Sequence, residues 1–400
     1  MFRPIRRSAS SLKVIVICLL RITIAWVGYS MATSIKSIVR REWPLPLGIA
    51  TTALFLCFGK EWLGDLSNPA WFGLMLGWLF GAISISAFAV VRHAEALAER
   101  VREPFGTLVL TLSMSGMEML MIASVMYFGG GGSSLGRDTM LAILMVVLNG
   151  LVGVSLLVGG LRYHEQTYNL YGANAFLSVI VPLSVLGLVM PSFTVSSPGP
   201  TLSSLQSTFL IMMSVGLYGV FLAIQTMRHR DYFVLINAAH DSIGHAGTQA
   251  VHNGQSTKHH TLLLLAFVPF IVLLAKQIAY GTNVLGVPPA LGGLLVATLI
   301  LLPESLAAVR AAGANQIQRS INLSLGTALS SISLTIPAVL IIGFLTDKTV
   351  ILGLGAGDMV LLLLTLVVSM LTFALERTNV LQGAIHLLLF LAYLILIFEK

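Results

Sequence analysis

Two glutamates, Glu118 and Glu304, each stand alone in a long apolar stretch of this sequence. Gly106 precedes the first by twelve residues, and Gly292 precedes the second by the same number. A carboxylate in such surroundings costs several kcal/mol, so an ionisable residue there is a candidate for binding a cation or a proton. The alternative is a protonated glutamate hydrogen-bonded to a neighbouring helix, which explains one such residue more readily than two at matching positions. We therefore predict that Glu118 and Glu304 together bind cations and protons.

The composition places these glutamates in a membrane. Of the 400 residues, 56% are hydrophobic and 10% are charged, and the mean hydropathy is +0.91. This is too little charge to cover the surface of a soluble protein. Apolar runs of about 20 residues, each long enough to cross a bilayer, recur from about residue 44 onward. We predict an all-α, polytopic membrane protein with about eleven transmembrane helices, at 44–60, 70–91, 105–128, 139–160, 174–190, 206–227, 262–280, 286–308, 320–343, 358–375 and 379–398.

The basic residues predict how these helices are oriented. If the N-terminus is cytoplasmic, alternate connectors lie inside, and they hold Arg92, Arg100, Arg102, Arg162, Arg228, Arg230, Lys258, Arg310, Arg319 and Arg377. The opposite connectors offer little beyond Lys60, Arg137 and Lys348. Because cytoplasmic loops carry the excess of Lys and Arg, we expect the N-terminus inside and the C-terminus outside. The net charge of +7 is scattered over the connectors, which argues against a nucleic-acid partner.

The two acidic spans, the third and the eighth, are expected to run in opposite directions, since five connectors separate them. One ligand from each half at the midplane is typical of an inverted repeat. The chain is divided accordingly into a basic, amphipathic N-terminal extension (1–43), a first helix with an N-terminal repeat (44–227), a cytoplasmic histidine-rich linker (228–261) and a C-terminal inverted repeat (262–400).

Two segments outside the spans receive no firm role. Residues 1–43 combine a basic start with an apolar stretch that Arg21 interrupts, which favours a surface amphipathic helix over a signal peptide or an extra span. The linker suggests metal binding or pH sensing because of its histidines, which are His229, His240, His245, His252, His259 and His260. They lack the spacing of metal ligands, so we expect a poorly ordered linker whose histidines have at most a mild effect on the function of the protein.

Polar, uncharged side chains in two other spans are secondary candidates. Asn149 lies in the fourth span, and Ser330 and Ser331 lie in the ninth with further hydroxyl residues nearby. Their oxygens match the hard ligands that Ca²⁺ or Na⁺ prefers, although small hydroxyl residues are also common in ordinary helix packing. Pro303 precedes Glu304 and removes a backbone donor, which predicts a weakened helix that borders a cavity.

Five runs of residues surround these positions: EPFGTLVL at 103–110 followed by Glu118, LNGLVG at 148–153, PESLA at 303–307, QRSINL at 318–323 and RTNVLQG at 377–383. Together they resemble the bacterial ChaA-type calcium/proton antiporters, part of the wider calcium/cation antiporter group. The resemblance covers about residues 44–400. It implies an inner-membrane protein with a first helix and two inverted five-helix repeats of the sodium/calcium-exchanger type. It also places the family's two essential acidic positions at Glu118 and Glu304, while Arg102 and the histidine-rich linker depart from the family pattern.

The resemblance and the paired glutamates predict a secondary active antiporter rather than an enzyme. It would export Ca²⁺, with Na⁺ or K⁺ as alternatives, in exchange for H⁺ by alternating access, with Glu118 and Glu304 as ligands of the cation and no cofactor. The alternatives are a monovalent Na⁺/K⁺–proton antiporter with little calcium transport and a cation channel. A membrane enzyme would need a nucleophile with a base, or a histidine cluster, inside the spans, where only His386 lies deep. The expected partners are the lipid bilayer and the transported ions, and the oligomeric state does not follow from the sequence.

Overall fold

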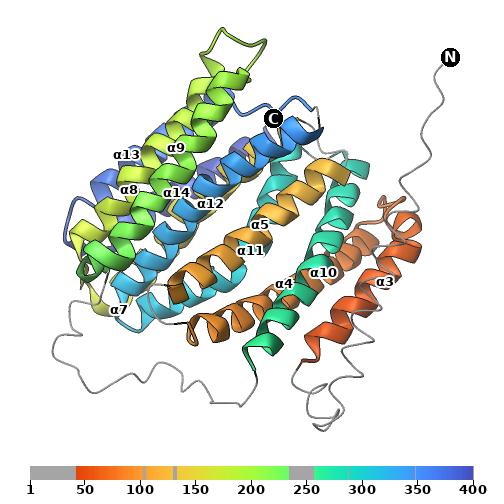
Figure 1. Cartoon of the computed structure of the whole chain (residues 1–400), viewed down its shortest axis with the longest axis horizontal. Helices are drawn as coiled ribbons and strands as arrows, with labels where there is room; N and C mark the ends of the chain where they lie inside the picture. The colour runs from red at the N-terminus through yellow and green to blue at the C-terminus, as the bar shows by residue number, and fades with distance from the viewer. Residues whose placement is uncertain are drawn as a thin grey trace.

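The computed structural model describes residues 42–101, 105–128, 133–233, 256–286, 288–346 and 348–399. Within these ranges the chain forms eleven long helical segments (Figure 1). They are α3 (Pro44–Trp62), α4 (Pro69–Ala98), α5 (Phe105–Phe128), α6 with η1 and α7 (Leu135–Tyr163), α8 with η2 and η3 (Leu170–Ser192), α9 with η4 (Ser204–Arg228), α10 (Thr257–Val284), α11 (Pro289–Gly313), α12 (Ile317–Thr346), α13 (Ala356–Thr372) and α14 (Val380–Phe398). The predicted count of eleven is confirmed. The predictions for residues before 42 and for 234–255 lie outside the described residues.

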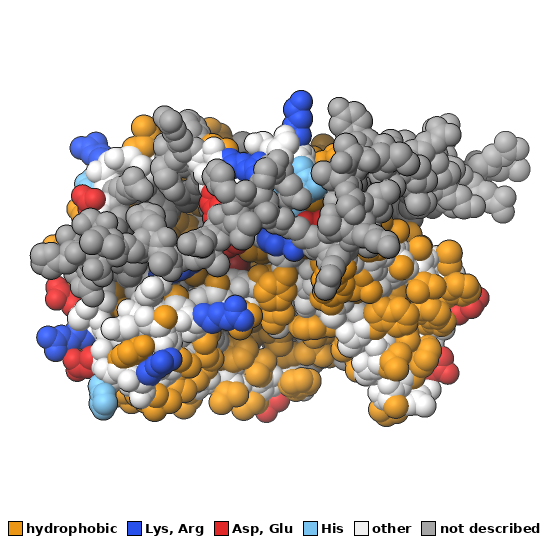
Figure 2. Space-filling model, turned by 90° about the horizontal axis from the view of Figure 1, so that it is seen from below, with side chains coloured by type: hydrophobic (Ala, Val, Ile, Leu, Met, Phe, Trp, Pro, Cys, Tyr) orange, Lys and Arg blue, Asp and Glu red, His pale blue; other side chains and the backbone are white. Residues whose placement is uncertain are grey.

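The outer surface of these helices is apolar. Eight of the described segments are long and apolar enough to cross a membrane by length and composition alone, and apolar stretches of α5 and α13 are shorter. Leu205 and Val360, for example, leave 81% and 67% of their surface exposed. Figure 2 shows hydrophobic side chains covering a broad stretch of one face. A patch of this size is typical of a surface that contacts lipid rather than water.

Short polar motifs decide where several helices begin. The Asn68 side chain accepts a hydrogen bond from the Ala70 N–H at 2.9 Å and caps α4. Helices α9 and α14 start with complete capping boxes, formed by Ser203 with Gln206 and by Asn379 with Gln382. Each such cap satisfies otherwise unpaired backbone N–H groups and contributes about 1 kcal/mol.

Three spans depart from regular α-helix. The π-helical segments are η1 (Met145–Leu151), η2 (Val185–Val189) and η4 (Ile224–Arg228). A π turn inserts one extra residue and is found mostly at functional sites. The sequence pattern predicted regular helices here, because apolar residues fill both geometries equally well. By contrast, α11 continues through Pro303 to Gly313, so the expected weakening does not break the helix.

Alternate connectors lie at the same end of the molecule. At one end, strand β1 (Gln166–Thr167) pairs antiparallel with strand β2 (Arg377–Thr378). At the other end, the Ile351 N–H donates to the Ser133 carbonyl at 3.0 Å. Both contacts join connectors that the sequence assigned to the same side, so the predicted alternation of spans is confirmed. Helices α5 and α11, which carry the two glutamates, therefore run in opposite directions.

After α3, the spans form two groups of five that interlock. The first group runs from α4 to α9 and the second from α10 to α14. Helix α5 packs against α12 of the second group, whereas α11 packs against α6 and α7 of the first. The approach of α11 to α6 is close, because a Cβ built at Gly293 would lie 3.0 Å from the Asp138 backbone. The acidic helix of each half thus packs against helices of both halves.

The linker is shorter than the predicted 228–261. Arg228 ends η4, the short helix η5 (Arg230–Phe233) follows, and α10 already begins at Thr257. Ser256 sets this start, since its hydroxyl accepts a hydrogen bond from the Lys258 N–H at 3.3 Å. His259 and His260 consequently belong to the first turn of α10 rather than to the linker.

Candidate functional site

Glu118 lies inside the molecule on α5, with 3% of its surface exposed. Both carboxyl oxygens accept hydrogen bonds from α12, since Ser331 Oγ donates to Oε2 at 2.6 Å and Thr335 Oγ1 donates to Oε1 at 3.2 Å. The shorter distance is typical of a hydroxyl that donates to an ionised carboxylate. A hydroxyl also carries two lone pairs, so the same groups can accept a hydrogen bond from a protonated carboxyl or bind a cation.

Glu304 lies on α11 and is only partly buried. Its Oε2 accepts a hydrogen bond from Thr327 Oγ1 of α12 at 3.3 Å. The two glutamates are close enough for the negative charge of Glu118 to act on Glu304. Both carboxyl groups are therefore held by hydroxyl donors of one helix.

The three donors form a single stripe on α12. Thr327, Ser331 and Thr335 are spaced four residues apart, so they lie on one face of the helix. Each step of four residues rises about 6 Å along the axis. The three hydroxyl groups therefore form a row of oxygen ligands that extends from Glu304 past Glu118.

A cavity of about 480 Å³ reaches one of the two carboxyl groups. Near the site it is lined by Pro303, Glu304, Thr327 and Ser330. Toward the β1–β2 end of the molecule it is lined by Glu95, Gln225, Phe233, Gln318 and Arg319. A second cavity of about 280 Å³ is lined by residues of the opposite end, such as Lys348. Neither glutamate is among the described residues that line this second cavity, whereas the first cavity reaches Glu304 from the β1–β2 end.

The secondary candidates lie in different places. Ser331 contacts Glu118 directly, and Ser330 lines the cavity while its hydroxyl donates to the Thr327 carbonyl at 3.1 Å. Asn149 is fully buried in η1 and directs its polar atoms away from the glutamates. Its Nδ2 donates to Thr365 Oγ1 at 2.8 Å, and its Oδ1 lies 3.3 Å from His386 Nδ1. The structure therefore brings Ser330 and Ser331 to the site and places Asn149 in a separate polar network of α13 and α14.

Thr327 is the functional residue that the sequence analysis missed. Its hydroxyl is the donor to Glu304, yet the ninth span holds many hydroxyl residues and nothing marked this one. The available signal was its spacing of four residues from Ser331, which puts both on one face of a helix.

Comparisons with known proteins agree with this architecture. The family model described as "Sodium/calcium exchanger protein" matches residues 71–227 and 259–399. The chain is 39% identical to the "Sodium-potassium/proton antiporter ChaA" of Escherichia coli (strain K12), over 88% of this chain and 94% of that protein. It is also 39% identical to the "Putative ionic transporter y4hA" of Sinorhizobium fredii (strain NBRC 101917 / NGR234), over 79% of this chain and 86% of that protein.

Two solved structures share the fold. Native YfkE aligns with a TM-score of 0.66 at 16% identity and covers 89% of this chain and 100% of its own. The H⁺/Ca²⁺ exchanger CAX aligns with a TM-score of 0.62 at 14% identity and covers 90% of this chain and 89% of its own. At these identities the likeness establishes the arrangement of helices.

Proposed function

This chain belongs to the sodium/calcium exchanger family, and from that premise we propose that Glu118 and Glu304 are the site at which it exchanges a cation for protons. The observation that carries this proposal is the hydroxyl stripe of α12, which holds both carboxyl groups beside a cavity open to one end. Two carboxyl groups from opposed helices, joined by one helix, form a compact site that each side of the membrane can reach in turn.

Cation transport is coupled to proton transport through the charge of the two carboxyl groups. As carboxylates they attract a cation, and as neutral acids they hold protons, so cation and protons exclude each other. A difference of one pH unit supplies about 1.4 kcal/mol for each proton moved. The membrane potential supplies about 2.3 kcal/mol per net charge for each 100 mV. The proton gradient can therefore drive a cation against its own gradient, and the membrane potential contributes only where an exchange cycle moves net charge.

Ca²⁺ is the first candidate for the transported cation. Two carboxylates balance the charge of a divalent ion, and the hydroxyl oxygens of Thr327, Ser331 and Thr335 add the hard ligands that Ca²⁺ prefers. Na⁺ or K⁺ is the second candidate, because the Escherichia coli relative is named a sodium-potassium/proton antiporter.

The cavity faces the cytoplasm of a bacterium in this proposal. The β1–β2 end carries most of the basic connector residues of the described chain, including Arg100, Arg162, Arg319 and Arg377, whereas the opposite connectors hold Lys60, Arg137 and Lys348. Basic residues are retained on the cytoplasmic side of the inner membrane. The N-terminus is then inside and the C-terminus outside. A reporter active only in the cytoplasm should give no signal when fused after Glu399 and a strong signal when inserted after Phe233, and the reverse pattern contradicts the orientation.

Proton release from acid-loaded, inside-out membrane vesicles tests the function itself. Addition of a transported cation should discharge the pH gradient, and the order of response to Ca²⁺, Na⁺ and K⁺ identifies the substrate. Vesicles from cells carrying Glu304→Gln serve as the matched control. A gradient that no cation discharges beyond this control contradicts the proposed exchange.

A further inference from the structure

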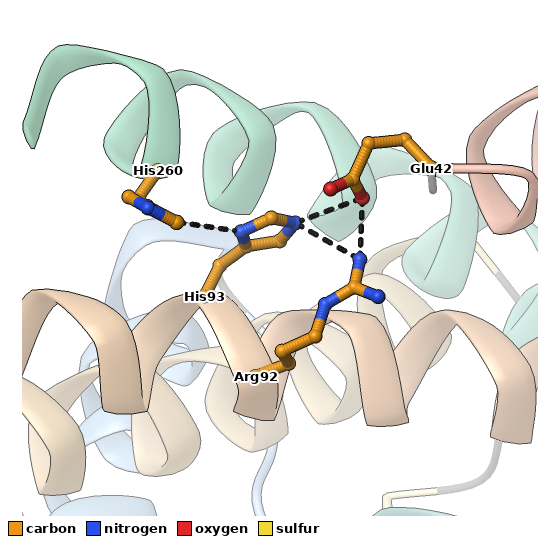
Figure 3. Close-up of polar contacts among 4 residues, drawn as sticks. All are labelled: Glu42, Arg92, His93 and His260. Carbon is orange, nitrogen blue, oxygen red and sulfur yellow. Dashed lines mark hydrogen bonds and ion pairs between the residues drawn. The ribbon is translucent and has the colours of Figure 1, made fainter. Parts of the chain in front are cut away.

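A second cluster of titratable side chains lies at the cavity end, apart from the two transport glutamates (Figure 3). Glu42 precedes α3, Arg92 and His93 belong to α4, and His260 belongs to the first turn of α10. Glu42, His93 and His260 are 3%, 1% and 6% exposed. Buried groups of this kind are stable only where each is paired, so the contacts within the cluster decide its protonation.

His93 joins the other members of the cluster. Its Nε2 lies 3.3 Å from Glu42 Oε2 and 3.4 Å from Arg92 Nη2, and Glu42 also pairs with Arg92. Its Nδ1 lies 3.0 Å from Nδ1 of His260, a residue 167 positions further along the chain. The Phe267 ring stacks on His93 with an interplanar angle of 25°. A chain of polar contacts thus links the start of α3, the end of α4 and the start of α10.

The contact between the two rings limits how many protons they hold. A hydrogen bond between two Nδ1 atoms needs one proton, since one nitrogen donates and the other accepts. A neutral pair meets this condition in two ways. Either His260 donates to His93 while His93 Nε2–H donates to Glu42, or His93 Nδ1–H donates to His260 while His93 Nε2 accepts from Arg92. A pair with one added proton meets it as well, because a protonated His93 donates to both neighbours. Two protonated rings place two N–H donors against each other at 3.0 Å, which breaks the contact.

We propose that His93 and His260 form a regulatory proton-binding site, which clamps α10 to α4 while the facing nitrogens share one proton and opens when both rings are protonated. Glu95 stands two residues after His93 on α4 and lines the cavity to Glu304. Opening the clamp therefore alters the cavity that leads to the transport site. The functional part of this inference rests on the proposed exchange activity, whereas the opening of the clamp does not.

The surrounding positive charges oppose a second proton on the pair. The charged or titratable groups that act on the two rings are Glu42 before α3, Arg92 and Arg100 at the end of α4, and His259 on α10. Burial raises the pKa of the Glu42 carboxyl, but the hydrogen bond with His93 and the charge of Arg92 together hold the pKa below its ordinary value. Glu42 thus stays ionised over the range in which histidines titrate, but Arg92 already shares its charge, so a second imidazolium finds no counter-charge.

Cation-dependent exchange, measured against the pH on the cavity side, is the first arm of the test. The parent protein should lose exchange by about tenfold per pH unit below the point at which the second proton binds, as one inhibitory proton requires. His260→Asn offers a donor and an acceptor near the Nδ1 position but takes up no proton, so its acid limit should move down by about one pH unit or more. His260→Ala removes the contact and should exchange slowly at every pH.

His164→Asn is the matched control. His164 is exposed at the same end, with φ 64°, and Asn is among the residues that tolerate positive φ. Its pH profile should follow the parent, because it lies outside the cluster.

A distance measurement tests the clamp without relying on transport. Spin labels at Glu99→Cys and Thr261→Cys, in a background without Cys18 and Cys57, report the separation of α4 and α10. The distance distribution should be narrow at about pH 8 and broader at about pH 4, where both rings take up a proton. The distribution should stay narrow at both pH values in His260→Asn and broad at both pH values in His260→Ala. A parent distribution that is the same at both pH values, or a His260→Asn variant that follows the parent, overturns the proposal even if no cation is exchanged.

Discussion

Replacing Glu118 by glutamine keeps the size of the side chain and one oxygen for the Ser331 hydroxyl, but it removes a charge from a site with 3% exposure. The variant therefore separates the charge of this residue from its shape. A neutral side chain is also easier to bury in a membrane. We expect normal insertion together with a loss of exchange.

The size of the loss follows from the charge. Two unit charges 4 Å apart attract by about 4 kcal/mol at an effective dielectric constant near 20, so a divalent cation loses about twice that when one carboxylate becomes neutral. Part of this is regained, because one charge fewer must be desolvated in the site. A net loss of about 4 kcal/mol corresponds to about a thousandfold, at a factor of ten for each 1.4 kcal/mol.

Calcium-dependent proton flux in inside-out vesicles, with the amount of protein in the membrane quantified, measures this loss. Glu118→Gln and Glu304→Gln should each fall to background, and Glu118→Asp should retain part of the activity because its charge survives. Glu99→Gln is the control, since Glu99 is exposed beyond the end of α4. Glu95 is unsuitable as a control because it lines the cavity. Near-parental exchange by either glutamine variant would refute the two-carboxylate mechanism.

Three further outcomes follow from the structure. Ser331→Ala removes the 2.6 Å hydrogen bond to the Glu118 carboxyl group and should weaken the apparent cation affinity by about ten- to a hundredfold. Thr335→Val should weaken it less, because the bond that it removes is 3.2 Å long. Equal effects of the two variants in a cation titration would contradict this order. Gly293→Val inserts atoms 3.0 Å from the α6 backbone and should lower the melting temperature in detergent, whereas Gly77→Ala, with nothing within 4 Å, should not. The pKa of Glu42 is lower in the folded protein than its ordinary value, so the ionised carboxylate stabilises the fold at pH values above the ordinary pKa. This stabilisation disappears as the pH falls through the pKa of the folded protein. The melting temperature of Glu42→Gln should therefore depend less on pH than that of the parent over this acidic range.

The spans were predictable because apolar length and local end signals coincide. Helix α9 with η4, for example, was expected at 206–227 and extends from Ser204 to Arg228. The capping box of Ser203 and Gln206 fixes its start, and a charged residue marks its end. The acidic pair was predictable in the same way, since isolated carboxyl groups in apolar helices are rare and functional.

The partners of these groups were not predictable, because they depend on how helices rotate against one another. Thr327 is one of many hydroxyl residues in its span, and only the packing of α12 against α11 selects it. Asn149 stands in a π turn, where the extra residue shifts the direction of side chains away from the regular helical phase. His260 was assigned to the linker because the apolar run begins after it, and no local pattern indicates its contact with His93, which lies 167 residues earlier.

Each half of the molecule supplies a wall for the glutamate of the other, since α5 rests on α12 and α11 rests on α6 and α7. A chain cut between Phe233 and Ser256 retains all of these contacts when its two pieces meet in a bilayer. The pieces made as separate polypeptides should consequently find each other and function, whereas either one alone lacks the part of the wall that the other supplies. The covalent connection between η5 and α10 then ensures equal numbers of the two halves, while the packed helices keep them together.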